Sequence, residues 1–159
     1  MTGQREFPEL DPRRETNALL RSMSQLSDDH EREATPLMAA LLHHGDPDVR
    51  QEALRKLTVH WKNPGYRQAA RDAVANDPDE GVRATAAFGI ASLSTKETAV
   101  DDTSLLLPVV RAEHLGPELR ISAYEALLLL HGRRDLPPLD PVVDPRAAID
   151  WDWIGSLTR

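Results

Sequence analysis

The sequence predicts an all-α fold, a solenoid built from helix pairs. Three observations predict it: a short motif recurs three times, turn-forming residues precede each copy, and only 4% of residues are aromatic while Ala and Leu are prominent. Small aliphatic side chains favour thin helical layers over an aromatic-rich β sandwich. The 159 residues are enough for one such domain.

The motif consists of an apolar residue, Arg, Ala and a second aliphatic residue at fixed offsets. Its copies are Val49-Arg50-x-x-Ala53-x-x-x-Leu57, Val82-Arg83-x-x-Ala86-x-x-x-Ile90 and Leu119-Arg120-x-x-Ala123-x-x-x-Leu127. Apolar residues four positions apart share a helix face, and the small Ala lets a second helix approach closely. The motif arginines lie 33 and then 37 residues apart, which is room for two short helices and their turns.

Each copy of the motif lies at the predicted start of a helix. The residues before the copies are Asp46-Pro47-Asp48, Asp77-Pro78-Asp79 and Gly116-Pro117-Glu118. Asp caps a helix, Pro suits the first turn, and acidic side chains favour the positive end of the helix dipole. We therefore expect helices over about 47–61, 79–93 and 117–131.

A partner helix is predicted upstream of each copy, over about 36–44, 65–75 and 103–114. Thr35-Pro36, Asn63-Pro64 and Asp102-Thr103 open these helices, and Pro108 falls in the first turns of the last one. We interpret Asp101-Asp102 as capping and solvated-turn residues. The repeats span about 35–62, 63–95 and 101–132 of a solenoid domain over 14–132, which follows a flexible tail over 1–13. A further helix over about 16–26 covers the first repeat.

The C-terminal part, 133–159, is predicted to be a Pro-rich connector and a Trp-containing capping segment. Its prolines, which exclude an ordinary helix over 133–146, are Pro137, Pro138, Pro141 and Pro145. Trp151, Trp153 and Ile154 follow, although a disordered tail is poor in aromatic residues. We expect these side chains to pack on the last repeat or on the face of the motif helices; the alternative is a recognition peptide.

These residues resemble the HEAT-repeat family, especially the short bacterial kind found in proteins similar to phycobilisome lyases. The resemblance covers about residues 35–132, and the Asp-Pro-Asp…Val-Arg…Ala signature is its most specific element. It implies a right-handed α-α superhelix whose motif Arg and turn Asp link adjacent repeats. The residues that it makes structural are Asp46, Asp48, Arg50, Asp77, Asp79, Arg83 and Arg120. A ladder of partner-binding arginines is the alternative.

Function on such a scaffold is usually carried by an exposed inner, concave surface. At about 100° per residue, the positions two, six, nine and thirteen after the motif Val or Leu point away from the buried face. The partner-binding face predicted in this way contains Gln51, Arg55, Thr58, Lys62, Phe88, Ile121, Glu125 and Leu128. Apolar residues beside charges are typical of a protein interface. The alternative is a different helix rotation, which would place Phe88, Ile121 and Leu128 in the core.

The charge and motif content favour a binding protein over an enzyme. A net charge of −7 disfavours nucleic acid, whose binding draws on clustered Lys and Arg, and favours a protein partner, in particular a basic one. The chain has no cysteine, phosphate loop or nucleophile elbow. His43 and His44 are adjacent and diverge on a helix, which makes them poor joint ligands. We predict no catalytic residue, metal or cofactor.

The expected function is that of a non-catalytic protein-binding module, monomeric when free. Residues 1–15 lack a signal peptide's apolar stretch, and no run approaches the roughly 20 apolar residues of a membrane span, so we expect a cytoplasmic protein. One concrete form of the function is an immunity-type inhibitor of a bacterial toxin. The resemblance also permits a bilin lyase or isomerase, and the small size permits a subunit or scaffold of a larger assembly.

Overall fold

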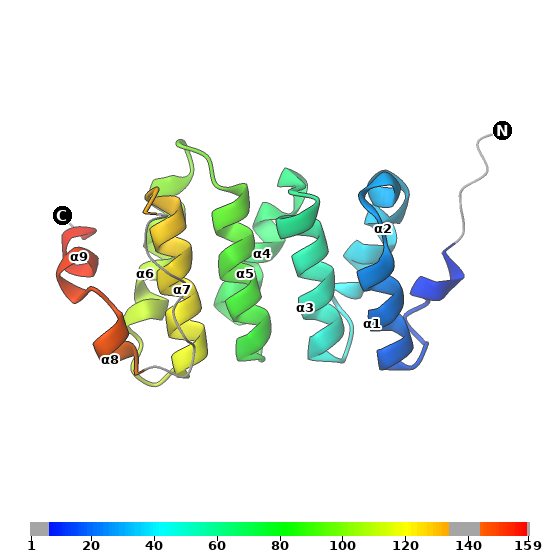
Figure 1. Ribbon diagram of the computed structural model, residues 1–159, viewed down its shortest axis with the longest axis horizontal. Coiled ribbons are helices and arrows are strands. Elements are labelled where there is room, and N and C mark those ends of the chain that lie inside the picture. The colour runs from blue at the N-terminus through cyan, green and yellow to red at the C-terminus, as the bar shows by residue number, and fades with distance from the viewer. Residues whose placement is uncertain (1–6, 134–143, 159) are drawn as a thin grey trace.

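The computed structural model describes residues 7–133 and 144–158. Within these ranges the chain contains helices and no strand, and the helices stand side by side in a row with the two ends of the chain at opposite ends (Figure 1). This arrangement confirms the predicted all-α solenoid of helix pairs. Residues 1–6 of the expected N-terminal tail and 134–143 of the expected connector, with Pro137, Pro138 and Pro141, lie outside the described residues.

The helices form two layers. One layer, here called the B row, contains α1 (Thr16–Gln25), α3 (Pro47–Arg55), α5 (Glu80–Leu93) and α7 (Pro117–Leu130). In the second layer, α2 (Glu31–Leu41), α4 (Arg67–Asn76) and α6 (Ala99–Arg111) each pack against the B-row helix that follows. Helix α5 therefore has α3 on one side, α7 on the other and α4 behind it.

Short turns complete the helical elements. Pro8–Leu10, Asp28–His30 and Pro64–Tyr66 form 3₁₀ turns, and α3 continues into a π-helical turn over Lys56–His60. The π turn buries Lys56 and directs its Nζ to the carbonyl of Leu26, 2.9 Å away, just after α1 ends. Within the predicted N-terminal tail, Phe7 and Leu10 are buried in a core cluster with residues of α1, α2 and α3.

The motif residues occupy matching interior positions in the three repeats. Val49, Val82 and Leu119 are at most 2% exposed, and the motif Ala and second aliphatic residue of each copy are completely buried. The B-row helices begin where the turn residues predict. Asp46 accepts a hydrogen bond from the Asp48 amide and Asp79 accepts one from the Val82 amide.

The motif arginines connect each B-row helix to the end of the preceding second-layer helix. Arg83 Nε donates to the carbonyl of Val74 at 2.9 Å, and Arg120 Nε donates to that of Val110 at 3.0 Å. Arg50 donates to the carbonyls of His44 and Gly45, just after α2, and also bonds both carboxylate oxygens of Asp77, at 3.0 and 2.9 Å, which links the first repeat to the second. These contacts support the structural role that the motif implies for the arginines.

Two second-layer helices begin earlier than predicted. Helix α2 begins at Glu31 and contains Pro36, and α6 begins at Ala99 and contains Pro108. In both helices a threonine bonds the carbonyl four residues before it: Thr35 to Glu31 at 2.6 Å, and Thr103 to Ala99 at 2.7 Å. These threonines therefore lie inside helices rather than at the caps that they were expected to form.

Asp102 departs most from the sequence prediction, because it is completely buried rather than solvated. Its Oδ1 accepts hydrogen bonds from Arg67 at 2.5 Å and Arg71 at 2.6 Å, and its Oδ2 accepts one from Ser94 at 2.8 Å. A carboxylate is buried at acceptable cost only when it is paired and hydrogen-bonded. The cluster therefore connects α4 to α6 and to the end of α5.

The C-terminal segment lies at the end of the row, beyond α6 and α7 (Figure 1). It comprises α8 (Pro145–Ala148) and α9 (Trp151–Ser156), and buries Ile149 and Ile154 in the same core cluster as α7. The Trp153 ring meets Tyr124 and His131 edge-on, with centroids 5.9 and 5.7 Å apart. Arg111 of α6 donates to the Ile154 carbonyl at 3.2 Å.

We predict that Asp102→Asn destabilises the fold strongly. The substitution leaves two arginines close together with no carboxylate between them, and breaking a buried ion pair costs about 3–5 kcal/mol. Its neighbour Asp101 is exposed, so Asp101→Asn removes the same charge from the same helix and should stay within about 0.5 kcal/mol of wild type. Urea unfolding of the two variants measures both values, and equal unfolding free energies would contradict the role given to Asp102.

A second prediction concerns the two tryptophans of α9. Trp153→Ala removes the ring that contacts Tyr124 and His131, so it should lower the free energy of unfolding by about 2 kcal/mol. Trp151 is more exposed, and Trp151→Ala should cost less than about 1 kcal/mol. Thermal melts of both variants and of a chain ending at residue 146 would test this. A truncated chain that melts like wild type would show that the segment adds no stability.

The third prediction is a loss of stability in mild acid through His131. Burial lowers the pKa of His131 from its ordinary value of 6.5, and the ring bonds the Thr103 hydroxyl at 3.0 Å. Because the unfolded chain binds the proton more readily, stability should fall as the pH drops through 6.5 and be unaffected by this group above it. Unfolding midpoints from about pH 8 to about pH 5 should decline less in His131→Gln. If the unfolding midpoints of wild type and His131→Gln fall equally with pH, the loss of stability does not arise from His131.

Candidate partner-binding face and an interhelical pocket

The exposed side of the B row is a narrow stripe that crosses three helices. Arg55, Phe88 and Glu125, six residues after the motif Val or Leu, are partly exposed on α3, α5 and α7. These are three of the residues that the sequence assigned to a binding face. Gln51 is also partly exposed and donates to Thr85 at 2.9 Å, and Lys62 is exposed just after the π turn.

Three other predicted face residues are buried, which corrects the sequence analysis. Thr58 is 0%, Ile121 1% and Leu128 5% exposed, because the positions two and nine after the motif residue point at the neighbouring helix. The π turn that continues α3 contacts α5 closely at Thr58. A Cβ added to Gly89 would lie 2.4 Å from the Thr58 hydroxyl, so only glycine fits there.

The residues that replace them lie one position further along each helix. The positions three and ten after the motif residue hold Glu52 on α3, Val59 in the π turn that continues it, Thr85 and Ser92 on α5, and Leu129 on α7, whereas Ser122 at the remaining position is buried. Leu129 is 40% exposed, which is unusual for a large aliphatic side chain in this protein. The apolar Leu127–Leu130 run offered no signal to separate exposed from buried leucines.

We call the exposed side of the B row the B-helix face. It consists of Glu52, Arg55, Val59, Thr85, Phe88, Ser92, Glu125 and Leu129. Within this face Arg55 pairs with Glu52, at 2.7 and 2.8 Å, so the guanidinium is neutralised by its own helix. The face thus combines apolar side chains, hydroxyls and a charge pair, and of these the apolar side chains gain free energy on leaving water. Such a surface suits a protein partner.

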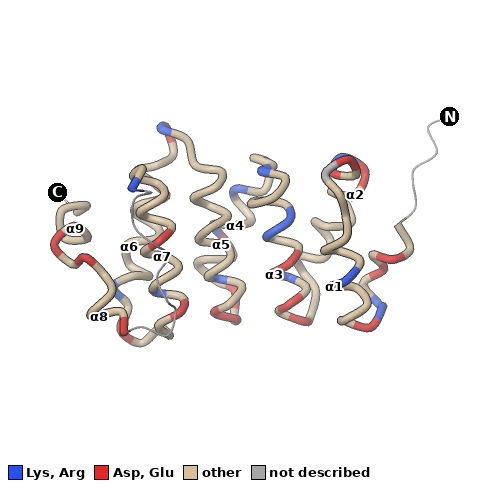
Figure 2. Tube along the Cα trace, viewed as in Figure 1, with Lys and Arg blue, Asp and Glu red and all other residues tan. Residues whose placement is uncertain are grey.

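Acidic residues gather along one edge of the molecule, where α3, α5 and α7 begin (Figure 2). Several are engaged within the fold. Asp46 accepts from the Thr16 hydroxyl at 3.0 Å, and both Glu80 oxygens accept from the Gly116 amide at 3.1 and 3.2 Å. Burial acts to raise the pKa of Asp77, but hydrogen bonds from Arg50 and the Asp79 amide outweigh it and hold this pKa below its ordinary value.

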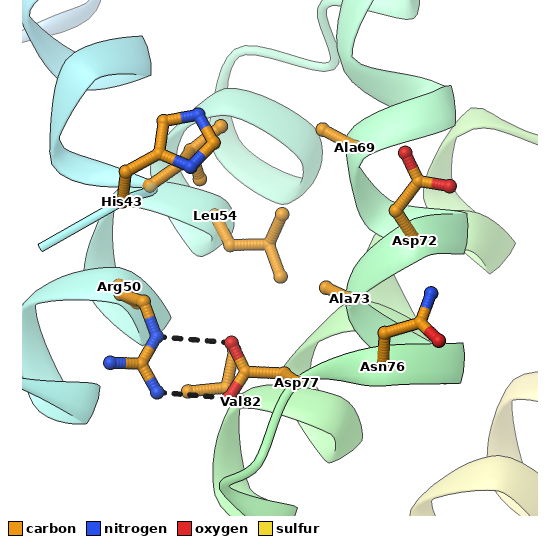
Figure 3. Close-up of a pocket in the computed structure, with 10 residues that line it drawn as sticks. His43, Arg50, Leu54, Ala69, Asp72, Ala73, Asn76, Asp77 and Val82 are labelled. Carbon is orange, nitrogen blue, oxygen red and sulfur yellow. Dashed lines mark hydrogen bonds and ion pairs between the residues drawn. The ribbon is translucent and has the colours of Figure 1, made fainter.

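A pocket of about 280 Å³ opens between α2 and α4 (Figure 3). Its lining is apolar at Leu42, Leu54, Ala69, Ala73 and Val82 and polar at His43, Arg50, Asp72, Asn76 and Asp77. In Figure 3 the Arg50–Asp77 pair lies along one side, while His43 and Asp72 stand on opposite sides of the hollow. No sequence motif marks this pocket, because its residues come from three helices, α3, α4 and α5, and from the turns that follow α2 and α4.

The described ranges contain neither a cluster of metal ligands nor a membrane-spanning helix. No group of three or more His, Asp or Glu side chains there is placed to hold a metal ion. No helix in those ranges is both long and apolar enough to cross a bilayer.

The paired helices, the motif arginines and the exposed B row define the protein as an α-solenoid. The family model for HEAT repeats matches residues 34–128. The chain belongs to the HEAT-repeat family, as its motif indicated, and HEAT repeats generally mediate interactions between proteins. Searches of curated proteins and of solved structures found no match.

Proposed function

We propose that this protein is a non-catalytic binding module whose protein partner docks on the B-helix face. The observation that carries the proposal is the apolar stripe of Val59, Phe88 and Leu129, which crosses the π turn after α3 and the helices α5 and α7 and remains partly exposed, to 40% at Leu129. Interface energy usually concentrates in a few aromatic or aliphatic anchors surrounded by polar groups. Phe88 lies on the central helix and is the expected anchor.

The charge distribution favours a basic partner. The net charge is −7, and the acidic edge lies at the starts of the same helices that carry the face. Opposite charge on a partner speeds association and selects against other proteins. One form of this function is inhibition of a basic toxin. In that form, the protein would cover the toxin's active surface when the toxin is bound to the B-helix face.

We predict that the double substitution Phe88→Ala and Leu129→Ser weakens partner binding by at least about 30-fold, the effect of losing a hot spot of about 2 kcal/mol. A photo-cross-linking residue at position 92 should capture the partner, and calorimetry with the purified partner then gives the affinity. Cross-linking from position 104, an exposed site on α6 away from both the B-helix face and the pocket, is the matched control and should capture nothing.

Stability is monitored in the same experiment, because Phe88 is partly buried. Ser92→Arg adds bulk and charge to the face without removing an apolar contact, so it should block binding while leaving the thermal midpoint near wild type. An undiminished affinity in both the double variant and Ser92→Arg would refute the B-helix face as the docking surface.

A further inference from the structure

We propose that the pocket between α2 and α4 binds an arginine side chain of a basic protein partner. This site lies in the second layer, apart from the B-helix face, and the proposal does not depend on the function proposed for that face. Three properties of the pocket support it: its size, the state of its polar groups and its net charge.

The size of the pocket fits one long side chain. Its volume of about 280 Å³ falls below the roughly 300–1,000 Å³ typical of sites for cofactors and drug-sized ligands. The hollow exists because α4 presents the small residues Ala69 and Ala73 toward α2, with Leu54 lying across the space between them (Figure 3). The stem of a long side chain can lie along these aliphatic groups.

The cationic group of the pocket is already engaged, which disfavours an anionic ligand. Arg50 uses Nε and Nη2 for Asp77, and its Nη1 donates to the carbonyls of His44 at 3.0 Å and Gly45 at 3.1 Å. Asp77 also accepts from the Asp79 amide at 2.9 Å. An anion would have to break this network to gain a donor.

The polar groups on the α4 side favour a cation instead. Asp72 and Asn76 lie four residues apart on α4, and therefore on the same edge of that helix. Asp72 Oδ1 accepts one hydrogen bond from Gln68 at 2.8 Å, and the side chain is exposed. The charges of Arg50 and Asp77 cancel. Asp72 therefore gives the pocket a net negative charge when His43 is neutral.

An aliphatic stem with a cationic head describes both lysine and arginine, and the acceptors favour arginine. A planar guanidinium can donate to a carboxylate and to a second acceptor at once, whereas an ammonium acts as a point charge. The carboxylate of Asp72 and the carboxamide oxygen of Asn76 offer two such acceptors. Arginine stems also pack well on apolar surface while the head stays near water.

The test uses the whole chain and the blocked tripeptide Ac-Gly-Arg-Gly-NH₂, followed by ¹H–¹⁵N correlation spectra. We expect amide shifts confined to His43, Ala69, Asp72, Ala73 and Asn76, with a dissociation constant of about 1–10 mM for this single side chain. The same peptide with citrulline, which has the shape of arginine without its charge, should bind at least about 5-fold more weakly. The affinity of the corresponding lysine peptide should lie between those of the arginine and citrulline peptides.

Two pocket variants and two controls complete the experiment. Ala73→Leu fills the hollow and should abolish the shifts, and Asp72→Asn, on an exposed residue that leaves the fold intact, should weaken binding about as much as citrulline does. Asp48→Asn removes one exposed charge from the acidic edge and should change nothing. The Phe88→Ala/Leu129→Ser chain should bind the peptide normally, which separates this test from that of the B-helix face.

The proposal is overturned by any of three results. Shifts that spread along the acidic edge and persist in Ala73→Leu would show general attraction of a cation. If the citrulline and arginine peptides bind equally well, the pocket does not recognise charge. If Asp72→Asn binds the arginine peptide as well as wild type does, Asp72 is not its acceptor.

Discussion

The close side-by-side packing of α3, α5 and α7 determines which side chains of the B row reach solvent. Each helix buries its motif residues against the second layer and its flanks against its neighbours, down to the contact in which only a glycine at position 89 leaves room for Thr58. A helix enclosed on three sides keeps one exposed stripe. Any partner of the B row must therefore be recognised through side chains of that stripe.

Polar contacts set how successive repeats are joined. All three motif arginines donate to carbonyls near the end of the preceding second-layer helix, and Arg50 also bonds the carboxylate of Asp77. Asp102 adds a second kind of link, between the last two helices of the second layer. Charges engaged in this way are unavailable to a partner, and the pocket takes its acidic character from Asp72, which is exposed.

The two layers thus offer surfaces of different chemistry. The B-helix face presents apolar groups and an internally neutralised ion pair, which suits a broad and largely desolvated contact. The pocket behind it presents a small hollow with one carboxylate at its rim, which suits a single cationic side chain. A basic partner large enough to wrap the edge between the layers could engage both.

The amino-acid sequence by itself determined the repeat, the starts of the B-row helices and the family, because caps, Pro positions and motif spacing are local properties. It placed Phe88, Arg55 and Glu125 on an exposed face correctly. The rotation of each helix was decided only by tertiary packing: one residue corresponds to about 100°, so a small error exchanges Leu128 with Leu129. Contacts between distant segments, such as Asp102 with Arg67 and Arg71, and the pocket between α2 and α4, leave no periodic trace in the chain. They arise only when the layers are assembled.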